Sequence, residues 1–391
     1  MKVSDVKDLC EKYLEQMINL RETIHMYPED GFKEFKTSQI IINELEKLGI
    51  KAKKVAKTGV VGLIEGKYPG KTVLLRADMD ALKIQEMADV KYKSKIDGMM
   101  HACGHDGHVA GLLGAAMILN ELKDKLHGNV KLVFQPAEER EGGALPMIKE
   151  GVLENPKVDA AFSAHLWGYL KEGQVHLKEG PMMAAPDIFN IKVIGKGGHG
   201  ALPQESVDPI VIECQIVNAL QTIVSRRTNP LDPVVVTCGK IQGGDSFNVI
   251  PNEVELEGTI RTFKEETRQL VPSIMKDLVK GITTSQGAKY EFKYKANYPA
   301  LINDTNMTNF AKESLKKVVG KDNVFDLKEP NMGGEDFAYF AQKVPSAFMF
   351  IGIANNESEP VIHHNPYFKW DSKNVGVLAK SLSQIAIDYL K

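Results

Sequence analysis

The chain has 391 residues, of which 43% are hydrophobic and 26% are charged, and its formal net charge at pH 7 is −2. A chain of this length predicts two or three domains, and the near-neutral charge gives no electrostatic reason to expect nucleic acid or an anionic membrane as a partner. No apolar run approaches the length of a membrane span, the N-terminal segment is too polar for a secretory signal, and the four cysteines are too scattered for a disulfide framework. We therefore expect a cytoplasmic protein.

The first part of the chain predicts two helices followed by two strands. Apolar residues at helical spacing predict helices over residues 6–26 and 37–48. Residues 60–65 and 72–77 are expected to form a pair of neighbouring strands joined by a Tyr-Pro-Gly turn. The second of these strands is apolar throughout, which indicates a sheet that is buried on both faces.

Acidic residues follow two of the predicted strands. Asp78 and Asp80 come after the apolar strand just described, and Glu138 and Glu139 follow another apolar strand at residues 130–134. Ligands and catalytic groups gather at the carboxyl ends of such strands. Adjacent carboxylates can divide the work, with one binding a metal while the other takes a proton from water. The alternatives are a turn-forming aspartate pair and a solvated acidic loop.

The most informative stretch is HACGHDGH, residues 101–108, which precedes a strongly helical run at residues 109–122. Within it, Cys103 and His105 can reach one metal centre if the backbone turns sharply, and the glycine between them permits such a turn. Three histidines, a cysteine and an aspartate within eight residues are hard to explain by packing. The alternative is a buried helix start with polar neighbours.

Two later segments add histidines of the same kind. A strand at residues 158–164 ends in His165, although a lone histidine is more often a satisfied core residue, and His363 and His364 lie in a loop. Together with the thiol, imidazole and carboxylate already named, His165 and one late histidine make five ligand-type side chains. That number is too large for one tetrahedral zinc and suits two metals that share a bridging group.

From residue 185 the pattern changes to strands that alternate in polarity. The order of elements is β-α-β-β-α-β, the split βαβ pattern of a ferredoxin-like sandwich with an antiparallel sheet. We interpret residues 185–296 as a domain inserted between residues 1–184 and 297–391, which would form a doubly wound, mainly parallel α/β domain. The expected strands of the insert are 187–194, 234–241, 253–263 and 289–296, and its expected helices are 208–226 and 267–282. The segment after the insert is expected to have helices at 305–318, from Glu335 onward and at 378–390, and a strand at 347–353.

The series of motifs resembles that of the M20 metallopeptidase family. Within the family it is similar to the amidohydrolase branch, which includes N-acyl-amino-acid hydrolases, hippurate hydrolases, auxin-conjugate hydrolases and N-acetyldiaminopimelate deacetylases. The resemblance covers nearly the whole chain. It is carried by HMYPEDGF, RADMDAL, MHACGHDGH, FQPAEE, SAHLW, GKGGHGALP, NVIPNEVELEGTIRT, GGEDFAYF and HHNPYF.

The resemblance implies two divalent metal ions (zinc, manganese, cobalt or nickel), with the thiolate of Cys103 between them. His364 is preferred to His363 because the family's histidine directly precedes a small residue and a proline, here Asn365-Pro366. The implied metal ligands are Cys103, His105, Glu139, His165 and His364.

The same resemblance implies the residues that act on the substrate. Glu138 would be the general base that takes a proton from water and passes it to the leaving amine. Asp80 falls where relatives carry an active-site aspartate, and Asp78 falls where the wider family carries a metal-binding histidine. The implied substrate-binding residues are His199, Asn248, Arg261 and Glu335, with a turn histidine and a structural salt bridge as the alternatives for His199 and Arg261.

Two positions depart from the pattern of the family. Lys83 stands where the family usually has a proline after the aspartate-containing strand end, and Gln204 stands where it usually has a second histidine. Neither Lys83 nor Gln204 is one of the implied metal ligands. Gln204 weakens any substrate assignment that is copied from a histidine-bearing relative.

The sequence therefore predicts an amidohydrolase of N-acyl amino acids whose inserted ferredoxin-like domain serves as a lid and dimerisation domain. A homodimer or homotetramer is expected, with a small N-acyl amino acid or short peptide as substrate. The nearest alternative is a carboxypeptidase or dipeptidase, because an amide is attacked in either case. A remote alternative is a non-catalytic metal-storage or redox-sensing protein, and Glu138 counts against it because such a protein has no use for a non-ligating carboxylate there.

Overall fold

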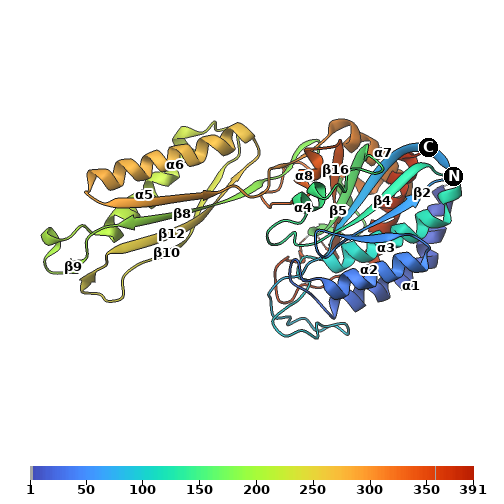
Figure 1. Ribbon diagram of the computed structural model, residues 1–391, viewed down its shortest axis with the longest axis horizontal. Coiled ribbons are helices and arrows are strands. Elements are labelled where there is room, and N and C mark those ends of the chain that lie inside the picture. The colour runs from blue at the N-terminus through green and yellow to red at the C-terminus, as the bar shows by residue number, and fades with distance from the viewer. Residues whose placement is uncertain (1–2, 357) are drawn as a thin grey trace. The chain divides into compact units, whose positions relative to one another are not determined.

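The computed structural model describes residues 3–356 and 358–391, which form two compact units. Unit 1 contains the chain up to Met182, Ile302–Glu329 and Tyr339–Lys391. Unit 2 contains Met183–Leu301 and Pro330–Ala338. Each unit combines helices with a sheet, as Figure 1 shows.

The segment Pro330–Ala338 groups with unit 2, although the sequence analysis assigned it to the catalytic domain. The amide of Ala184 donates to the carbonyls of Asn331 and Gly333, and Met183 forms a backbone bridge with Asn331. This pairing joins residues that are far apart in the sequence. No local pattern therefore indicates it.

Unit 1 is built on an eight-stranded mixed sheet. In spatial order its strands are β1 (Ala52–Val55), β2 (Gly59–Glu65), β4 (His127–Gln135), β3 (Tyr68–Asp78), β5 (Ala160–Lys171), β16 (Ser346–Ala354), β6 (Val175–Leu177) and β15 (Val324–Asp326). The neighbouring strands β4, β3, β5 and β16 run parallel, and antiparallel pairings adjoin them on both sides. Apolar runs such as the one in β3 occupy this parallel centre, where both faces of the sheet are buried.

The two strands expected to be neighbours, β2 and β3, are separated by β4, so that pairing prediction was wrong. β4 runs antiparallel to β2 and parallel to β3. Its start passes close to the first residues of β3, where a Cβ on Gly70 would lie 2.2 Å from the carbonyl oxygen of His127. Glycine at this position therefore permits the close approach of β4, which lies between β2 and β3 although a short turn connects those two strands.

Helix α3 (His105–Glu121) is the central helix of unit 1. It packs against β3 and against two further helices, α1 (Val3–His25) and α9 (Val375–Tyr389). The residues from His105 to Leu119 are all buried, as expected for a helix that is apolar on every side. The other helices are α2 (Phe35–Lys47), α4 (Ala144–Lys149), α7 (Thr305–Val319) and α8 (Ala338–Ala341), which begins at the boundary of the two units.

Unit 2 contains a four-stranded antiparallel sheet. In spatial order its strands are β10 (Val235–Gln242), β12 (Glu253–Thr262), β8 (Ala185–Ile194) and β13 (Lys289–Lys295). Helices α5 (Pro209–Thr222) and α6 (Glu265–Ser285) pack on each other and on this sheet, and the element order is the predicted β-α-β-β-α-β (Figure 1). The short strands β9 (Gly198–His199) and β11 (Val249–Ile250) of unit 2 pair with each other. β7 (Gly180–Met183) pairs with β14 (Leu301–Asn303), and both strands cross the boundary of the two units.

One helix of unit 2 ends earlier than the sequence predicted. The helical pattern extended to residue 226, but α5 ends at Thr222 and is followed by a π-helical turn, Ile223–Arg227. The strands follow the expected alternation, since Phe189 and Ile191 of β8 are buried while Ile188 is 43% exposed. One face of the sheet therefore forms the core of unit 2 together with the helices.

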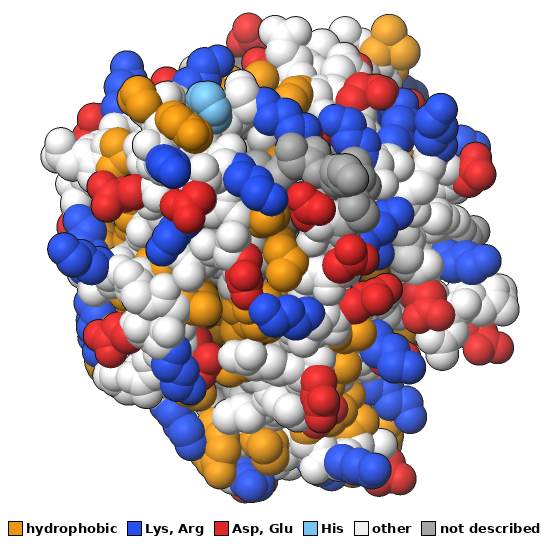
Figure 2. Space-filling model, turned by 90° about the vertical axis from the view of Figure 1, so that its right-hand side faces the viewer, with side chains coloured by type: hydrophobic (Ala, Val, Ile, Leu, Met, Phe, Trp, Pro, Cys, Tyr) orange, Lys and Arg blue, Asp and Glu red, His pale blue; other side chains and the backbone are white. Residues whose placement is uncertain are grey.

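The surface carries charges of both signs. On the face of the molecule shown in Figure 2, lysine and arginine side chains are interspersed with aspartate and glutamate. This mixture agrees with the formal net charge of −2. Among the helices of residues 3–356 and 358–391, none combines the length and the apolar character that crossing a membrane requires.

A buried ion pair joins the elements of unit 2. Asp187 of β8 is fully buried and accepts hydrogen bonds from Nε and Nη2 of Arg268 at 2.8 and 2.7 Å. The hydroxyl of Tyr294 and the amide of Asn297 also donate to it, at 2.5 and 2.9 Å. One carboxylate thus holds the start of α6 and the end of β13 against the first strand of the sheet.

Replacing Asp187 with alanine is expected to lower the free energy of unfolding of unit 2 by about 3–5 kcal/mol, because the Arg268 cation stays buried without its partner. Hydrogen exchange of the β8 amides, measured over a series of urea concentrations, gives this loss. The matched control is Glu257→Ala, which breaks an exposed ion pair with Lys240 and is expected to cost less than about 1 kcal/mol. Equal losses for the two variants would contradict the role assigned to Asp187.

Candidate active site

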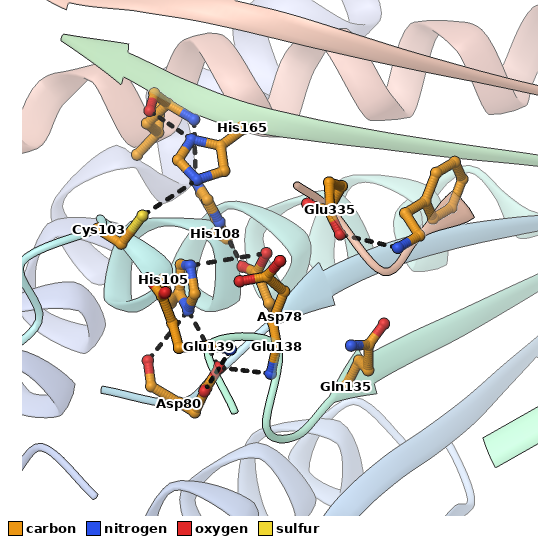
Figure 3. Close-up of polar contacts among 12 residues, drawn as sticks. Asp78, Asp80, Cys103, His105, His108, Gln135, Glu138, Glu139, His165 and Glu335 are labelled. Carbon is orange, nitrogen blue, oxygen red and sulfur yellow. Dashed lines mark hydrogen bonds and ion pairs between the residues drawn. The ribbon is translucent and has the colours of Figure 1, made fainter. Parts of the chain in front are cut away.

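The candidate site lies at the carboxyl ends of neighbouring strands in unit 1 (Figure 3). β3 ends at Asp78 and is followed by Asp80, while β4 ends at Gln135 and is followed by a turn with Glu138 and Glu139. Because β3 and β4 are parallel, these ends meet at one edge of the sheet. The structure therefore brings together the carboxylates that the sequence placed after two separate strands.

His165 occupies a different position from the one predicted. β5 continues to Lys171, and His165 lies inside the strand, opposite Phe350 of β16. The prediction that His165 ends its strand was therefore wrong. Pairing with β16, a partner from the last part of the chain, keeps the backbone extended beyond the histidine.

Helix α3 begins inside the histidine-rich motif, at His105 rather than at residue 109. Gly104 precedes it with a φ of 89°, a left-handed conformation that glycine adopts without strain. The turn directs the thiol of Cys103 toward His165, whose Nε2 lies 3.3 Å from Sγ. This local geometry is the sharp turn that the Cys-Gly-His spacing predicted.

The ligand-type side chains form two groups that share Cys103. His105 and His165 belong to the first group and Glu139 and His364 to the second, and within each group the candidate ligand atoms lie within 4.8 Å of one another. All five predicted ligands are therefore brought together. A thiolate common to two groups suits a bridge between two metal ions.

The structure distinguishes the two late histidines. Nε2 of His364 lies 3.0 Å from Oε1 of Glu139. Nε2 of His363 instead accepts a hydrogen bond from the amide of Gly168 at 2.9 Å, and its ring packs against Trp167. This geometry supports His364 as the ligand and leaves His363 with a structural contact.

Hydrogen bonds orient the ligand histidines. Nδ1 of His165 donates to the carbonyl of Leu166 at 2.6 Å, which leaves Nε2 to face Cys103. Nδ1 of His105 donates to the carbonyl of Asp80 at 3.0 Å. Its buried Nε2 lies 3.8 Å from Oδ2 of Asp78 and has no hydrogen-bond partner in the described part of the chain. Imidazoles whose second nitrogen is fixed in this way are typical of metal ligands.

The electrostatics of the site favour bound cations. Burial, together with the charges of Glu139 and Glu138, raises the pKa of the Cys103 thiol well above its usual range. Burial alone would lower the pKa of His105, but the charges of Asp78 and Asp80 raise it to about 10. Divalent cations would offset this concentration of negative charge and stabilise the thiolate. The donor set of carboxylates, imidazoles and one thiol therefore fits a pair of divalent ions.

Asp80 connects three segments of the site (Figure 3). Its Oδ1 accepts a hydrogen bond from the amide of Glu138 at 3.1 Å, and its Oδ2 accepts one from the amide of Glu139 at 3.0 Å. Its Oδ1 also lies 3.2 Å from Nδ1 of His105. The predicted active-site aspartate therefore holds the backbone of Glu138 and Glu139 and the ring of His105.

Asp78 is held by residues that the sequence analysis did not assign. Its Oδ2 accepts a hydrogen bond from Nη1 of Arg76 at 2.7 Å, and its Oδ1 accepts one from Nδ1 of His108. Nε2 of His108 in turn accepts from the amide of Leu166 at 2.9 Å. Burial would raise the pKa of Asp78, but His105, His108 and Arg76 hold it well below its usual range. Asp78 is thus a buried counter-ion, and the place of His108 in the histidine-rich motif was the only sequence signal for its role.

His199 and Asn248 come together in unit 2. β9 and β11 pair antiparallel with His199 opposite Val249, and the amide of Gly200 donates to the carbonyl of Asn248 at 2.9 Å. Both His199 and Asn248 are exposed. They lie at the end of unit 2 that carries the label β9 in Figure 1.

Arg261 and Glu335 lie elsewhere in unit 2. Arg261 is eight residues along β12 from Glu253, which is the end that adjoins β11. Eight residues of strand span roughly 27 Å at about 3.4 Å per residue, so unit 2 does not bring Arg261 together with His199. Oε1 of Glu335 accepts a hydrogen bond from the amide of Phe337 at 2.8 Å.

Comparison with known proteins identifies the family. A sequence model of peptidase family M20/M25/M40 matches residues 74–387. The chain belongs to this family. This M20 chain is 44% identical to an N-acyl-L-amino acid amidohydrolase of Geobacillus stearothermophilus, over 78% of its own length and 82% of that protein. It is 40% identical to thermostable carboxypeptidase 1 of Saccharolobus solfataricus, over 97% of each chain.

The M20 fold is also that of a solved relative. The crystal structure of a Bacillus subtilis protein described as a dinuclear metal binding peptidase from the M20 family superposes with a TM-score of 0.84 and 37% identity. The match covers 97% of this chain and 99% of that one. The chain is therefore a hydrolase with the M20 fold, and the groups around Cys103 are its candidate metal ligands.

Replacing His364 with alanine is expected to lower the metal content of this M20 hydrolase by one divalent ion from about two per chain, because the group with Cys103 and Glu139 loses its imidazole. Elemental analysis of the purified protein measures the content. The matched control is His363→Asn, in which an amide oxygen can still accept the Gly168 amide, and it is expected to keep both ions. Loss of metal from the His363 variant alone would reverse the assignment.

Proposed function

We propose that this M20 hydrolase cleaves the amide bond of N-acyl amino acids. The observation that carries the proposal is the pair of ligand groups that share Cys103, beside which Glu138 forms a further group with His105 and Glu139. A site with this donor set and an additional carboxylate is suited to activating water for attack on an amide carbonyl. The similarity to an N-acyl-L-amino acid amidohydrolase supports the substrate class.

The residues proposed to hold two divalent ions are Cys103, His105, Glu139, His165 and His364. The thiolate favours zinc, cobalt or nickel, while the carboxylate and imidazoles also admit manganese. When bound, divalent ions at such a site lower the pKa of water and polarise the substrate carbonyl.

Glu138 is proposed as the general base. Glu138 is buried, with 8% of its surface exposed, and its backbone amide donates a hydrogen bond to Asp80. From this position the carboxylate takes a proton from the attacking water and delivers it to the nitrogen of the leaving amine. The products are then a carboxylate and a free amino acid.

We propose that unit 2 serves as a lid and carries the residues that bind the substrate. His199 and Asn248 offer donors for the oxyanion that develops during attack. Arg261 can bind the substrate carboxylate through two parallel hydrogen bonds, and Glu335 is proposed to contact the substrate.

The state of the cysteines bears on the cellular compartment. Cys10, Cys103, Cys214 and Cys238 are all free. Free cysteines of this kind agree with a cytoplasmic location, which we propose for the protein.

Release of free amine from N-acetyl and N-benzoyl amino acids tests the proposed function. Activity is expected to vanish when the ions are chelated and to return with zinc, manganese, cobalt or nickel, because the metals polarise the carbonyl. The same panel includes free dipeptides, since the similarity to a carboxypeptidase makes a peptidase the second candidate. Faster cleavage of dipeptides would favour that candidate, and no turnover of any substrate by the metal-loaded protein would contradict both.

The variant Glu138→Gln tests the role of the proposed base in the same assay. It is expected to lower kcat by about 10²–10⁴-fold, because the amide cannot take the proton from water. The metal content should equal that of the unmodified protein, since Glu138 is not among the proposed ligands. A variant that keeps its activity would show that another group is the base.

We also propose that the chain forms a homodimer or homotetramer through unit 2. β10 is an edge strand whose Ile241 is 52% exposed, and Val211 of α5, a helix that contacts β10, is 53% exposed. An exposed strand edge flanked by apolar residues is suited to pairing with another chain. Because Arg261 and His199 lie at opposite ends of the sheet, one small substrate cannot contact both in the same chain, and a second copy could supply one of them.

Light scattering of the purified protein is expected to give the mass of at least two chains. Ile241→Glu should reduce that mass to one chain, because it introduces a charge at the proposed contact. The matched control is Ile96→Glu in unit 1, where the native side chain is 40% exposed, and it should leave the mass unchanged. A single-chain mass for the unmodified protein would refute the proposal.

A further inference from the structure

Three successive backbone amides in the turn after β4 donate to two buried carboxylates. The amide of Ala137 donates to Oε1 of Glu34 at 2.9 Å. The next two amides, those of Glu138 and Glu139, donate to Asp80 at 3.1 and 3.0 Å. The turn that carries the proposed base and one proposed ligand is therefore held by both carboxylates.

Ala137 has a backbone conformation that alanine seldom adopts. Its φ is 54°, which lies in the left-handed region. Such a conformation persists where surrounding contacts determine it, and the hydrogen bond to Glu34 is a contact of this kind. Because Glu138 and Glu139 follow directly, the conformation of Ala137 affects the direction in which both side chains leave the turn.

Glu34 is itself fixed by the fold. Its side chain is fully buried, and Oε2 accepts a hydrogen bond from the hydroxyl of Thr58 at 2.6 Å. Its carbonyl accepts from the amide and the hydroxyl of Ser38, at 2.9 and 2.6 Å, in the first turn of α2. Burial, with the charge of Asp80 adding to it, raises the pKa of Glu34 to about 7. An oxygen of either protonation state can accept the amide of Ala137.

We propose that Glu34 is a positioning residue that sets the orientation of Glu138 and Glu139 through the amide of Ala137. The inference rests on the proposed function, because it takes Glu138 as the base and Glu139 as a ligand. Within the described residues Glu34 belongs to none of the candidate ligand groups. Its hydrogen bond to the turn links it to the chemistry from a position 103 residues before Ala137 in the chain.

Two substitutions of Glu34 distinguish the effect of side-chain length from the effect of charge. Glu34→Gln keeps the length of the side chain and an oxygen for the Ala137 amide, whereas Glu34→Asp keeps the charge but cannot reach Ala137 and Thr58 together. Glu34→Asp is expected to lower kcat for an N-acetyl amino acid by about 10–100-fold with little change in KM, as is typical when a supporting partner of a metal site is lost. Glu34→Gln is expected to restore most of kcat. Thr58→Val is the matched control, because it removes the other hydrogen bond of Glu34 and should have a smaller effect than Glu34→Asp.

The visible absorption spectrum of the cobalt-loaded protein gives a second readout, because it reports the ligand geometry that includes Glu139. Glu34→Asp should change the spectrum and weaken cobalt binding by about 10–100-fold, and Glu34→Gln should match the unmodified protein. The proposal is overturned if Glu34→Asp lowers only the unfolding temperature, or if Glu34→Gln is impaired as much as Glu34→Asp. A lack of hydrolysis by the unmodified protein would overturn the proposed function instead, and the cobalt spectra would still decide the role of Glu34.

Discussion

The carboxylate of Asp80 is the contact on which the geometry of the site depends. It joins the end of β3 to the start of α3 and to the turn after β4, because it lies against His105 and accepts the amides of Glu138 and Glu139. An ionised carboxylate offers two oxygens with several acceptor positions, so one side chain can fix an imidazole and a backbone turn together. Segments from three parts of the chain thereby keep one common geometry.

A second series of contacts extends from Asp78 to β5. His108 donates to Asp78 and accepts from the amide of Leu166, which is the residue after His165. With Arg76 and its histidine neighbours beside it, Asp78 remains ionised although it is fully buried. Buried charge is tolerable here because each member is paired or hydrogen-bonded. The pairing in turn places the strand that carries His165 against the helix that follows Cys103.

The sequence was sufficient for several features that depend on near neighbours in the chain. An apolar strand and the acidic residues after it are adjacent, as are Cys103 and His105, and polarity alternates within single strands of unit 2. The sequence missed three features that depend on a distant partner. His108 acts through Leu166, Glu34 acts through Ala137, and β4 separates β2 from β3 after entering from later in the chain.

Two of the proposed ligands, His165 and His105, are held by a different kind of structure from the base. His165 lies in a strand paired with β16 and His105 lies in the first turn of α3, so backbone hydrogen bonds of regular elements fix both. Glu138 lies in a turn, which has no such ladder, and a misplacement of about 1 Å in an active site can cost roughly 10²-fold in rate. The turn must therefore take its rigidity from side chains outside it. This requirement explains why two carboxylates, which are costly to bury, accept its three amides.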